Sequence, residues 1–315
     1  MARLRLGTRG SQLARWQAEH IAAKLRSRGH EVEIQIIKTT GDSVAKMPLP
    51  KAAGSTKAIF IKEIEEALAE GSIGLAVHSL KDLPAEAPAE FEIAAVSERA
   101  EPRDAFVSQS VLRLSDLPRG ASVATSSLRR QAQLKALRAD LKIVPVRGNV
   151  DSRLRRLQAG EFDAIILAAA GLLRLQRVEL LRELISPEIM CPAAGQGALA
   201  IEIRAGEAEL RRQIEFLNHA ETSRATHCER ALLKKLGGGC QVPIGALATI
   251  VDGGLQLTAV VARPDGSEVL RAIQRGKDAA ELGAAVGEEL LQKGAARILR
   301  EATVPGGMAA VPQQP

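Results

Sequence analysis

The stretch that indicates the fold class is Ile73-Gly74-Leu75-Ala76-Val77-His78-Ser79-Leu80-Lys81-Asp82-Leu83-Pro84. Its first half is an apolar run of the type found in strands that are buried on both faces. Its second half places the charged pair Lys81-Asp82 directly after that strand. In open α/β sheets, ligands bind beyond the carboxyl ends of the strands. The stretch therefore predicts a helix-covered sheet with charged side chains at its ligand-binding edge.

The segments on either side of this stretch alternate between strand and helix. A short strand over 4–6 leads through Ser11, a residue type favoured at helix N-caps, into a helix to about Arg28. A half-buried strand is predicted over 32–36. Further on, strands are predicted over 121–124, 143–146 and 162–168, and Asp151 or Ser152 is expected to cap the helix before the last of them. This alternation predicts open, mostly parallel α/β sheets.

The chain after about residue 221 has a different pattern. A helix to about Leu236 is followed by predicted strands over 246–251, 255–261 and 268–274, and then by one helix over 278–301. This order predicts a small α+β domain. Because 315 residues are too many for one compact core, we expect several domains. The predicted units are 1–98 with 198–216 (α/β), 102–192 (α/β), 220–303 (α+β) and a flexible tail over 304–315.

The overall composition is that of an ordinary globular protein, with 46% hydrophobic and 25% charged residues. The sequence contains no apolar run of membrane-spanning length and no signal peptide at its start. Its three cysteines are scattered and lack paired metal-ligand spacing, which argues against both a disulfide framework and a metal site. We therefore expect a cytoplasmic protein that binds no metal and no membrane.

The formal net charge of +6 raises the question of a nucleic-acid partner. However, aromatic residues make up only 2% of the chain and tyrosine is absent, although single-strand binders need aromatic side chains for base stacking. Excess arginine suits small polyanions equally well, because the guanidinium group pairs with carboxylates through two parallel hydrogen bonds. We therefore expect no nucleic-acid partner.

The arginines of the first two predicted domains gather where strands end and helices begin. Helix N-termini already favour anions, and the hydroxyls of Thr125, Ser126 and Ser127 precede one such start. Any one of these arginines, taken alone, is most simply read as a surface residue. Together they predict a site for a polyanionic ligand. They are Arg9, Arg129, Arg130, Arg147, Arg153 and Arg174.

Two further residues, Asp82 and Cys240, are candidates for a role in the chemistry. In a cleft lined by arginines, Asp82 would stay ionised and could stabilise a cationic intermediate. The alternative is that Asp82 only stabilises a turn, because it lies directly before Leu-Pro. Cys240 lies in the stretch 237–245, where three glycines precede it. Such a loop suits a thiol that carries a bulky group, while an incidental buried thiol is the alternative.

Several motifs, in order along nearly the whole chain, resemble those of the porphobilinogen deaminase family, also called hydroxymethylbilane synthases. They are Thr8-Arg9 with Ser11 and Leu13-Ala14, Val77 to Pro84, Pro102-Arg103-Asp104-Ala105-Phe106, Thr125-Ser126-Ser127-Leu128-Arg129-Arg130-Gln131, Arg147-Gly148-Asn149-Val150, Gly195-Gln196-Gly197, and Gly238-Gly239-Cys240-Gln241-Val242-Pro243-Ile244-Gly245. One motif departs from the family pattern. The family usually has GGKGLF where this chain has Gly54-Ser55-Thr56-Lys57-Ala58-Ile59-Phe60, so Lys57 and Phe60 are kept but a lid role is in question.

The resemblance implies a transferase that deaminates four porphobilinogen molecules and joins them head to tail into hydroxymethylbilane, with release of ammonia. It implies two domains like those of periplasmic binding proteins with the active cleft between them, a small third domain, and a monomer. It also implies a dipyrromethane cofactor bound to Cys240 through a thioether, with Asp82 as the catalytic aspartate.

The resemblance implies binding roles for a larger set of residues. The cofactor-binding residues are Ser79, Lys81, Thr125, Ser126, Ser127, Arg129, Arg130 and Arg147. The substrate-binding residues are Arg9, Ser11, Arg147, Arg153, Arg174 and Gln196.

Three other interpretations remain open at the level of sequence. A binding protein for small anions would need only the two α/β segments and would bind its ligand without Cys240. An RNA-binding protein would show strong, salt-dependent affinity. A protein that keeps the transferase fold but has lost its activity is harder to exclude from the sequence, although Asp82 and Cys240 are both present.

Overall fold

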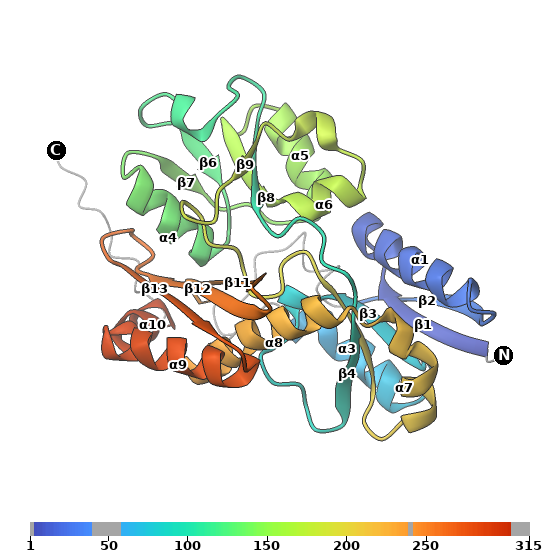
Figure 1. Cartoon of the computed structure of the whole chain (residues 1–315). Helices are drawn as coiled ribbons and strands as arrows, with labels where there is room; N and C mark the ends of the chain where they lie inside the picture. The colour runs from blue at the N-terminus through green and yellow to red at the C-terminus, as the bar shows by residue number, and fades with distance from the viewer. Residues whose placement is uncertain (1–2, 40–57, 239–241, 304–315) are drawn as a thin grey trace.

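The computed structural model describes residues 3–39, 58–238 and 242–303, with strands in three separate sheets (Figure 1). The strands are β1 (Arg3–Arg9), β2 (Glu31–Ile37), β3 (Leu75–Ser79), β4 (Phe91–Val96), β5 (Asp104–Ser108), β6 (Ser122–Ala124), β7 (Lys142–Val144), β8 (Ala164–Ala168), β9 (Glu183–Ile185), β10 (Leu199–Arg204), β11 (Ile244–Val251), β12 (Gly254–Ala262) and β13 (Val269–Gly276).

Most of the helices alternate with these strands along the chain. The α-helices are α1 (Gln12–Arg26), α3 (Ala58–Ala69), α4 (Leu128–Leu137), α5 (Val150–Gln158), α6 (Ala169–Arg174), α7 (Ala208–Ile214), α8 (Ala220–Lys235), α9 (Ala279–Gln292) and α10 (Ala295–Thr303). Short 3-10 turns are η1 (Leu80–Asp82), η2 (Leu114–Asp116), η3 (Val178–Leu180) and η4 (Glu215–Leu217). None of the described helices is long and apolar enough to cross a membrane.

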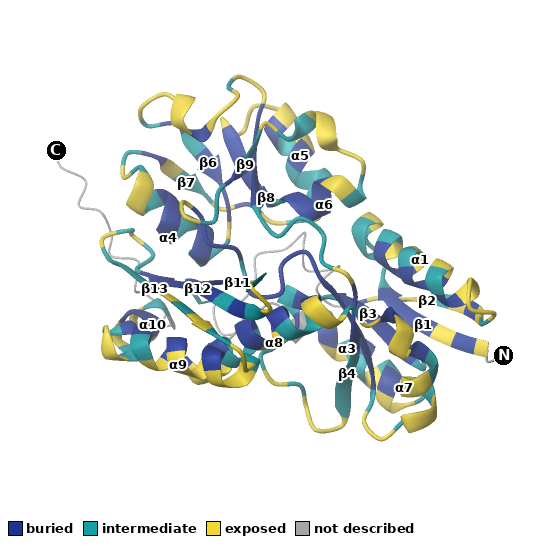
Figure 2. Ribbon diagram, in the orientation of Figure 1, coloured by how far each residue is buried: buried dark blue, intermediate teal, exposed yellow. Residues whose placement is uncertain are grey.

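The first sheet has the strand order β2-β1-β3-β10-β4 and is covered by helices on both faces. On one face, Ile21 and Leu25 of α1 belong to the same apolar cluster as Leu75 of β3. On the other face, Leu68 of α3 packs in a cluster with Ala76, the next residue of β3. Because successive side chains of a strand point to opposite faces, the apolar run of β3 is explained by burial on both sides. Figure 2 shows the strands as mostly buried and the outer helix faces as exposed.

The second sheet has the order β7-β6-β8-β5-β9 and is also covered on both faces. Leu134 of α4 packs in a cluster with Val123 of β6. Leu154 of α5 and Leu172 of α6 pack in a separate cluster with Ile165 of β8. The fold is therefore the predicted α/β class, in two helix-covered sheets.

The prediction of mostly parallel sheets needs one correction. Four of the five strands in each sheet run the same way, but one strand, β10 in the first sheet and β5 in the second, runs antiparallel to its neighbours. In the first, β1 runs parallel to β2 and β3, whereas β10 runs antiparallel to β3 and β4. In the second, β6 runs parallel to β7 and β8, whereas β5 runs antiparallel to β8 and β9. A strand buried on both faces has the same apolar pattern whichever way its neighbours run, so the sequence pattern could not reveal these directions.

The third sheet is antiparallel, with the order β11-β12-β13, and packs against helices α8 and α9. Its apolar core includes Leu232 of α8, Leu257 of β12 and Val286 of α9. The single helix predicted over 278–301 is in fact two helices. Gly294 separates α9 from α10 with φ +101°, a left-handed conformation that ends helices and that glycine adopts readily.

Candidate active site

The first group of predicted site residues lies where β1 and β3 end. These two strands are parallel neighbours, so their carboxyl ends meet at one edge of the first sheet. Arg9 ends β1, and the Ser11 side chain caps α1 by accepting a hydrogen bond from the Ala14 N–H (3.3 Å). Ser79 ends β3, and its hydroxyl oxygen accepts a hydrogen bond from the amide of Gln17 in α1 (2.9 Å). Helix α1 therefore ties the two strand ends together.

Asp82 and Lys81 lie in η1, the 3-10 turn that directly follows β3. Both side chains are half-buried. Leu80, the first residue of the turn, is buried and anchors it in an apolar cluster with Ala198 and Ala200. The turn thus holds the Lys81-Asp82 pair at the edge of the first sheet, as the sequence predicts.

The second group lies where β6 and β7 end, at the edge of the second sheet. Ser127 caps α4 by accepting from the Arg130 N–H (3.5 Å), and the Thr125 hydroxyl accepts from the Ser127 N–H (3.1 Å). The Ser126 hydroxyl donates to the Val146 carbonyl (2.8 Å) and accepts from the Val146 N–H (2.9 Å). This two-way bond holds the start of α4 beside the residue that precedes Arg147.

Arg129 and Arg130 converge on Asp104, a fully buried carboxylate at the start of β5. Arg129 Nη1 lies 2.7 Å from Asp104 Oδ2, and Arg130 Nη2 lies 2.7 Å from Oδ1. The same guanidinium groups donate to the backbone carbonyls of Cys191 (2.7 Å) and Ile166 (3.0 Å). Burial alone would raise the pKa of Asp104, but the charges of the two arginines overcome this and hold it well below its usual range.

Asp104 belongs to one of the motifs that resemble the family, but the sequence alone indicates no role for it. A single Asp at the start of a strand looks structural, and its importance follows only from the two guanidinium groups that the fold brings to it. The excess of cations nearby could have prompted a search for a buried counter-charge, because buried charges are almost always paired.

Gln196 joins the two groups of residues. It is fully buried and lies between β9 and β10, in the segment that returns the chain to the first sheet. Its amide nitrogen donates to Asp104 Oδ1 (2.9 Å) and to the Pro102 carbonyl (2.7 Å), and its amide oxygen accepts from Lys81 Nζ (3.2 Å). A hydrogen-bonded path therefore runs from Lys81 of the first sheet to the arginines of the second.

Asp82 acts electrostatically on two arginines of the second sheet. Burial and the charge of Arg130 lower the pKa of Arg153 to about 10, and the Asp82 carboxylate opposes that shift. Burial is also the largest cause that lowers the pKa of Arg130, and Asp104 and Asp82 oppose it. The Arg153 side chain is held in place by a hydrogen bond from its Nε to the Gly148 carbonyl (2.8 Å). The charge of Asp82, in the turn after β3, therefore acts on Arg130 and Arg153 of the helices that cover the second sheet.

Arg174 is the last residue of α6, and α6 contacts α1 of the first sheet (Figure 1). Its Nη2 donates to the Gly197 carbonyl (2.6 Å), and its guanidinium carbon lies 5.8 Å from the ring centroid of Trp16. Burial lowers the pKa of Arg174 to about 10, so the group is still cationic at neutral pH. The fold thus brings Arg174 to the boundary between the two sheets.

Three residues that the sequence selected are not placed. Cys240 and Lys57 lie outside the described residues, as does the side chain of Phe60. The other two cysteines, Cys191 and Cys228, are buried, and burial raises the pKa of each thiol to about 12. Both are therefore poor nucleophiles, because only the thiolate reacts readily.

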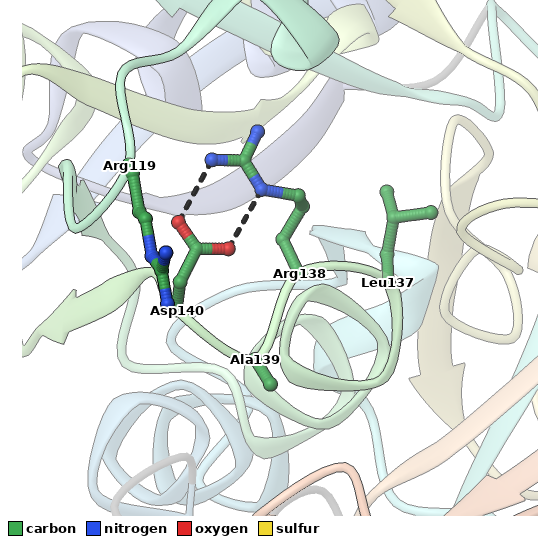
Figure 3. Close-up of a pocket in the computed structure, with 5 residues that line it drawn as sticks. All are labelled: Arg119, Leu137, Arg138, Ala139 and Asp140. Atoms are coloured by element: carbon green, nitrogen blue, oxygen red, sulfur yellow. Dashed lines mark hydrogen bonds and ion pairs between the residues drawn. The ribbon is translucent and has the colours of Figure 1, made fainter.

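A surface pocket of about 600 Å³ lies at the C-terminal end of α4 (Figure 3). Its lining residues are Arg119, Leu137, Arg138, Ala139 and Asp140. Arg138 and Asp140 pair through two hydrogen bonds of 2.8 Å, so these charges compensate each other. The pocket contains none of the residues selected from the sequence, and it lies at the opposite end of α4 from Arg129 and Arg130. We do not assign the active site to it.

Comparisons with known proteins show the family to which the chain belongs. Residues 4–212 match the family model "Porphobilinogen deaminase, dipyromethane cofactor binding domain", and residues 224–292 match "Porphobilinogen deaminase, C-terminal domain". The porphobilinogen deaminase of Chromobacterium violaceum is 51% identical over 94% of this chain and 96% of that protein. That of Thiobacillus denitrificans is 48% identical over 95% of this chain and 98% of that protein.

Solved structures show only weak similarity to this chain, as two examples illustrate. The periplasmic VFT2 domain of Bordetella pertussis BvgS has a TM-score of 0.42 and 14% identity, covering 67% of this chain and 85% of that one. The L-cystine solute receptor of Neisseria gonorrhoeae has a TM-score of 0.39 and 15% identity, covering 76% and 95%. On the strength of the family models and of relatives that match over nearly their whole length, the chain belongs to the porphobilinogen deaminase family.

Proposed function

We propose that this chain deaminates porphobilinogen and joins four molecules head to tail into hydroxymethylbilane, releasing ammonia, as a transferase of tetrapyrrole and heme biosynthesis. Family membership supports the reaction. The observation that supports the site is the hydrogen-bonded path from Lys81, the neighbour of Asp82, through Gln196 to Asp104, Arg129 and Arg130. A site that joins a carboxylate-bearing turn to a cluster of arginines suits a substrate with anionic side chains whose pyrrole ring becomes cationic during reaction.

The arginines supply the counter-charge for the substrate. Each porphobilinogen carries an acetate and a propionate, so two carboxylates enter the site with every added unit. Guanidinium groups bind carboxylates through two parallel hydrogen bonds. We propose that the substrate carboxylates are held by Arg9, Ser11, Arg147, Arg153 and Arg174.

The family model that matches the first 212 residues is named for a dipyrromethane cofactor, and the donor set fits that group. Arg129, Arg130 and Lys81 outnumber the carboxylate of Asp104 within the hydrogen-bonded cluster, so the cluster keeps net positive charge for an anionic pyrrole ligand. We propose that Ser79, Thr125, Ser126, Ser127 and Arg147 complete the cofactor site, and that the thiol of Cys240 anchors the cofactor through a thioether. When bound, the cofactor supplies the pyrrole carbon to which new units are joined.

The Asp82 carboxylate stabilises positive charge on the substrate. The aminomethyl group reacts in its protonated form, so when its C–N bond breaks the electron pair leaves with the nitrogen as neutral ammonia and the positive charge passes to the pyrrole that remains. A carboxylate already fixed nearby stabilises that cation without reorganisation. The short turn η1 holds the Asp82 backbone in place, because its first residue, Leu80, is buried.

The role of Asp82 is tested by comparing Asp82→Asn with Asp82→Glu. We expect Asp82→Asn to lower kcat by about 10²–10³, the usual loss when one preorganised electrostatic group is removed. Asp82→Glu keeps the charge but displaces it, so its kcat should lie between those of Asp82→Asn and the wild-type chain. Asp116→Asn is the matched control, because Asp116 also ends a 3-10 turn and lies in η2. Wild-type kcat in Asp82→Asn would contradict the assignment.

We further propose a cytoplasmic monomer that binds no nucleic acid. The scattered cysteines and the scarcity of aromatic residues support these proposals. Size-exclusion chromatography with light scattering measures the mass in solution, and RNA affinity at two salt concentrations tests the alternative of an RNA-binding protein.

A further inference from the structure

We propose that Gln196 is a positioning residue whose amide holds Lys81 in the active site and keeps its ammonium group apart from the carboxylate of Asp104. The inference rests on the proposed function, because it concerns the cofactor side of the same site. It differs from the substrate-binding role that the family resemblance implies for Gln196, because the side chain is completely buried and its amide already bonds to Lys81, Pro102 and Asp104.

The orientation of the Gln196 amide is fixed by its partners. Asp104 Oδ1 and the Pro102 carbonyl are acceptors, so both need the amide nitrogen. The Lys81 ammonium group is a donor, so it needs the amide oxygen. No flipped amide satisfies all three. The side chain therefore connects a cation on one sheet with an anion on the other in only one way.

The backbone on both sides of Gln196 is held as firmly as its side chain. A Cβ atom at Gly195 would lie 2.8 Å from Leu80, the first residue of the turn that carries Lys81, and Gly195 has φ +72°. A Cβ at Gly197 would lie 2.5 Å from the Ala100 carbonyl oxygen. The Gln196 carbonyl itself accepts from Arg99 Nε (2.8 Å). Glycine on each side thus allows the close packing that sets the position of the amide.

The neutral amide of Gln196 determines which charged groups pair with Asp104 and with Lys81. Asp104 pairs with Arg129 and Arg130, and its Oδ1 also accepts from the neutral Gln196 amide. If a cation replaced that amide, three positive groups would compete for one carboxylate. If an anion replaced it, two buried carboxylates would repel each other and Lys81 would be drawn into a strong ion pair. A neutral amide avoids both outcomes and leaves the charge of Lys81 directed toward a ligand carboxylate.

The test measures how fast apoprotein acquires its cofactor when incubated with porphobilinogen, by following the added mass of two linked pyrrole units. Gln196→Met removes both hydrogen-bonding groups at similar length, and we expect acquisition about tenfold slower, the usual effect of losing a hydrogen bond to a charged group. Lys81→Met should be slowed by at least as much. If Gln196 acts through Lys81, the double variant should be no slower than Lys81→Met alone.

Two more variants separate positioning from packing. Gln196→Glu has nearly the shape of the native side chain, so a packing role predicts near-normal acquisition, whereas our proposal predicts slower acquisition than Gln196→Met. Thr226→Val, which removes a buried hydrogen bond in α8, is the control for lost stability and should lower Tm without slowing acquisition.

The outcomes distinguish this inference from the proposed function. If wild-type apoprotein never gains the two-pyrrole mass, the proposed function itself is wrong. If wild-type protein gains it, but Gln196→Glu matches wild type or the slowing in the double variant is the product of the two single effects, only the role of Gln196 is overturned.

Discussion

The Asp104 carboxylate accepts hydrogen bonds from two guanidinium groups and one amide while fully buried. Because its pKa is held below the usual range, Asp104 stabilises the folded state fully above its unfolded pKa of about 3.9, and this stabilisation is lost as the pH falls through the lower native pKa. We predict that Asp104→Asn loses about 3–5 kcal/mol of unfolding free energy at pH 7, because it leaves two buried cations without their counter-charge.

In acid, the free energy of unfolding of Asp104→Asn should depend less steeply on pH than that of the wild-type protein. Urea unfolding at several pH values between 7 and 3 measures this, and the free-energy gap between wild type and Asp104→Asn should narrow as the pH falls. A gap that stays constant or widens below pH 4 would show that the Asp104 charge is not what stabilises the cluster.

At the scale of single residues, the sequence predicted the strand and helix ends at which the candidate site residues lie, but not all of their partners. The clustering of arginines where strands end and helices begin predicted Arg129 and Arg130 at a helix start, and both lie in the first turn of α4. That their guanidinium groups turn inward to Asp104 depends on β5, which the pattern did not connect to them. Burial and pairing are properties of three-dimensional neighbours, so residue spacing within one segment could not supply them.

At the scale of elements, helix α5 positions Arg153, and its N-cap is Asn149 rather than the predicted Asp151 or Ser152. The Asn149 side chain accepts a hydrogen bond from the Ser152 N–H (2.9 Å). We predict that Asn149→Ala costs about 1 kcal/mol of stability, the usual loss of an N-cap. It should also raise KM for porphobilinogen severalfold, because the start of α5 is the part that carries Arg153.

A second cap provides the control for this prediction. Asp278 caps α9 in the third unit by accepting from the Glu281 N–H (2.8 Å). Asp278→Ala should lose similar stability and leave KM unchanged. Steady-state kinetics and thermal unfolding of Asn149→Ala and Asp278→Ala test this prediction. Equal KM values in these two variants would contradict a role for α5 in substrate binding.

The sequence predicted where most elements begin and end, because apolar periodicity and cap residues are local signals. It did not predict β5 as a strand, and it missed the antiparallel direction of β10, which depends on how the chain passes between the two sheets. It also joined α9 and α10 into one helix. A glycine within a helical pattern does not by itself reveal that the chain adopts the left-handed conformation found at Gly294.

At the scale of the whole molecule, Glu229 of α8 connects the third sheet to both segments that pass between the first two. Its carboxylate is fully buried and pairs with Arg99 (2.6 Å), and it also accepts from the backbone N–H groups of Gly195 (2.6 Å) and Ala248 (2.8 Å). Arg99 in turn bonds to Gln196 of the active-site path. The third unit is thus coupled to the site through one buried ion pair.

We propose that the units 1–98 with 198–216, 102–192 and 220–303 are the folding domains, since each sheet lies within one of them. Glu229→Gln removes the charge that pairs with Arg99 and should cost about 3 kcal/mol or more. We predict a lower Tm and faster limited proteolysis between residues 192 and 220. Glu288→Gln, which breaks an exposed pair with Lys235, is the control and should change little. Unchanged proteolysis in Glu229→Gln would contradict this coupling.

The most direct test of the whole account is the intact mass of the purified protein beside that of Cys240→Ser, with Cys228→Ser as a matched control. We predict an added mass of two linked pyrrole units in wild type and in Cys228→Ser, and its absence in Cys240→Ser. If wild-type protein keeps its unmodified mass after incubation with porphobilinogen, or if Cys240→Ser gains the same addition, the covalent primer is not on Cys240 and the proposed mechanism is wrong.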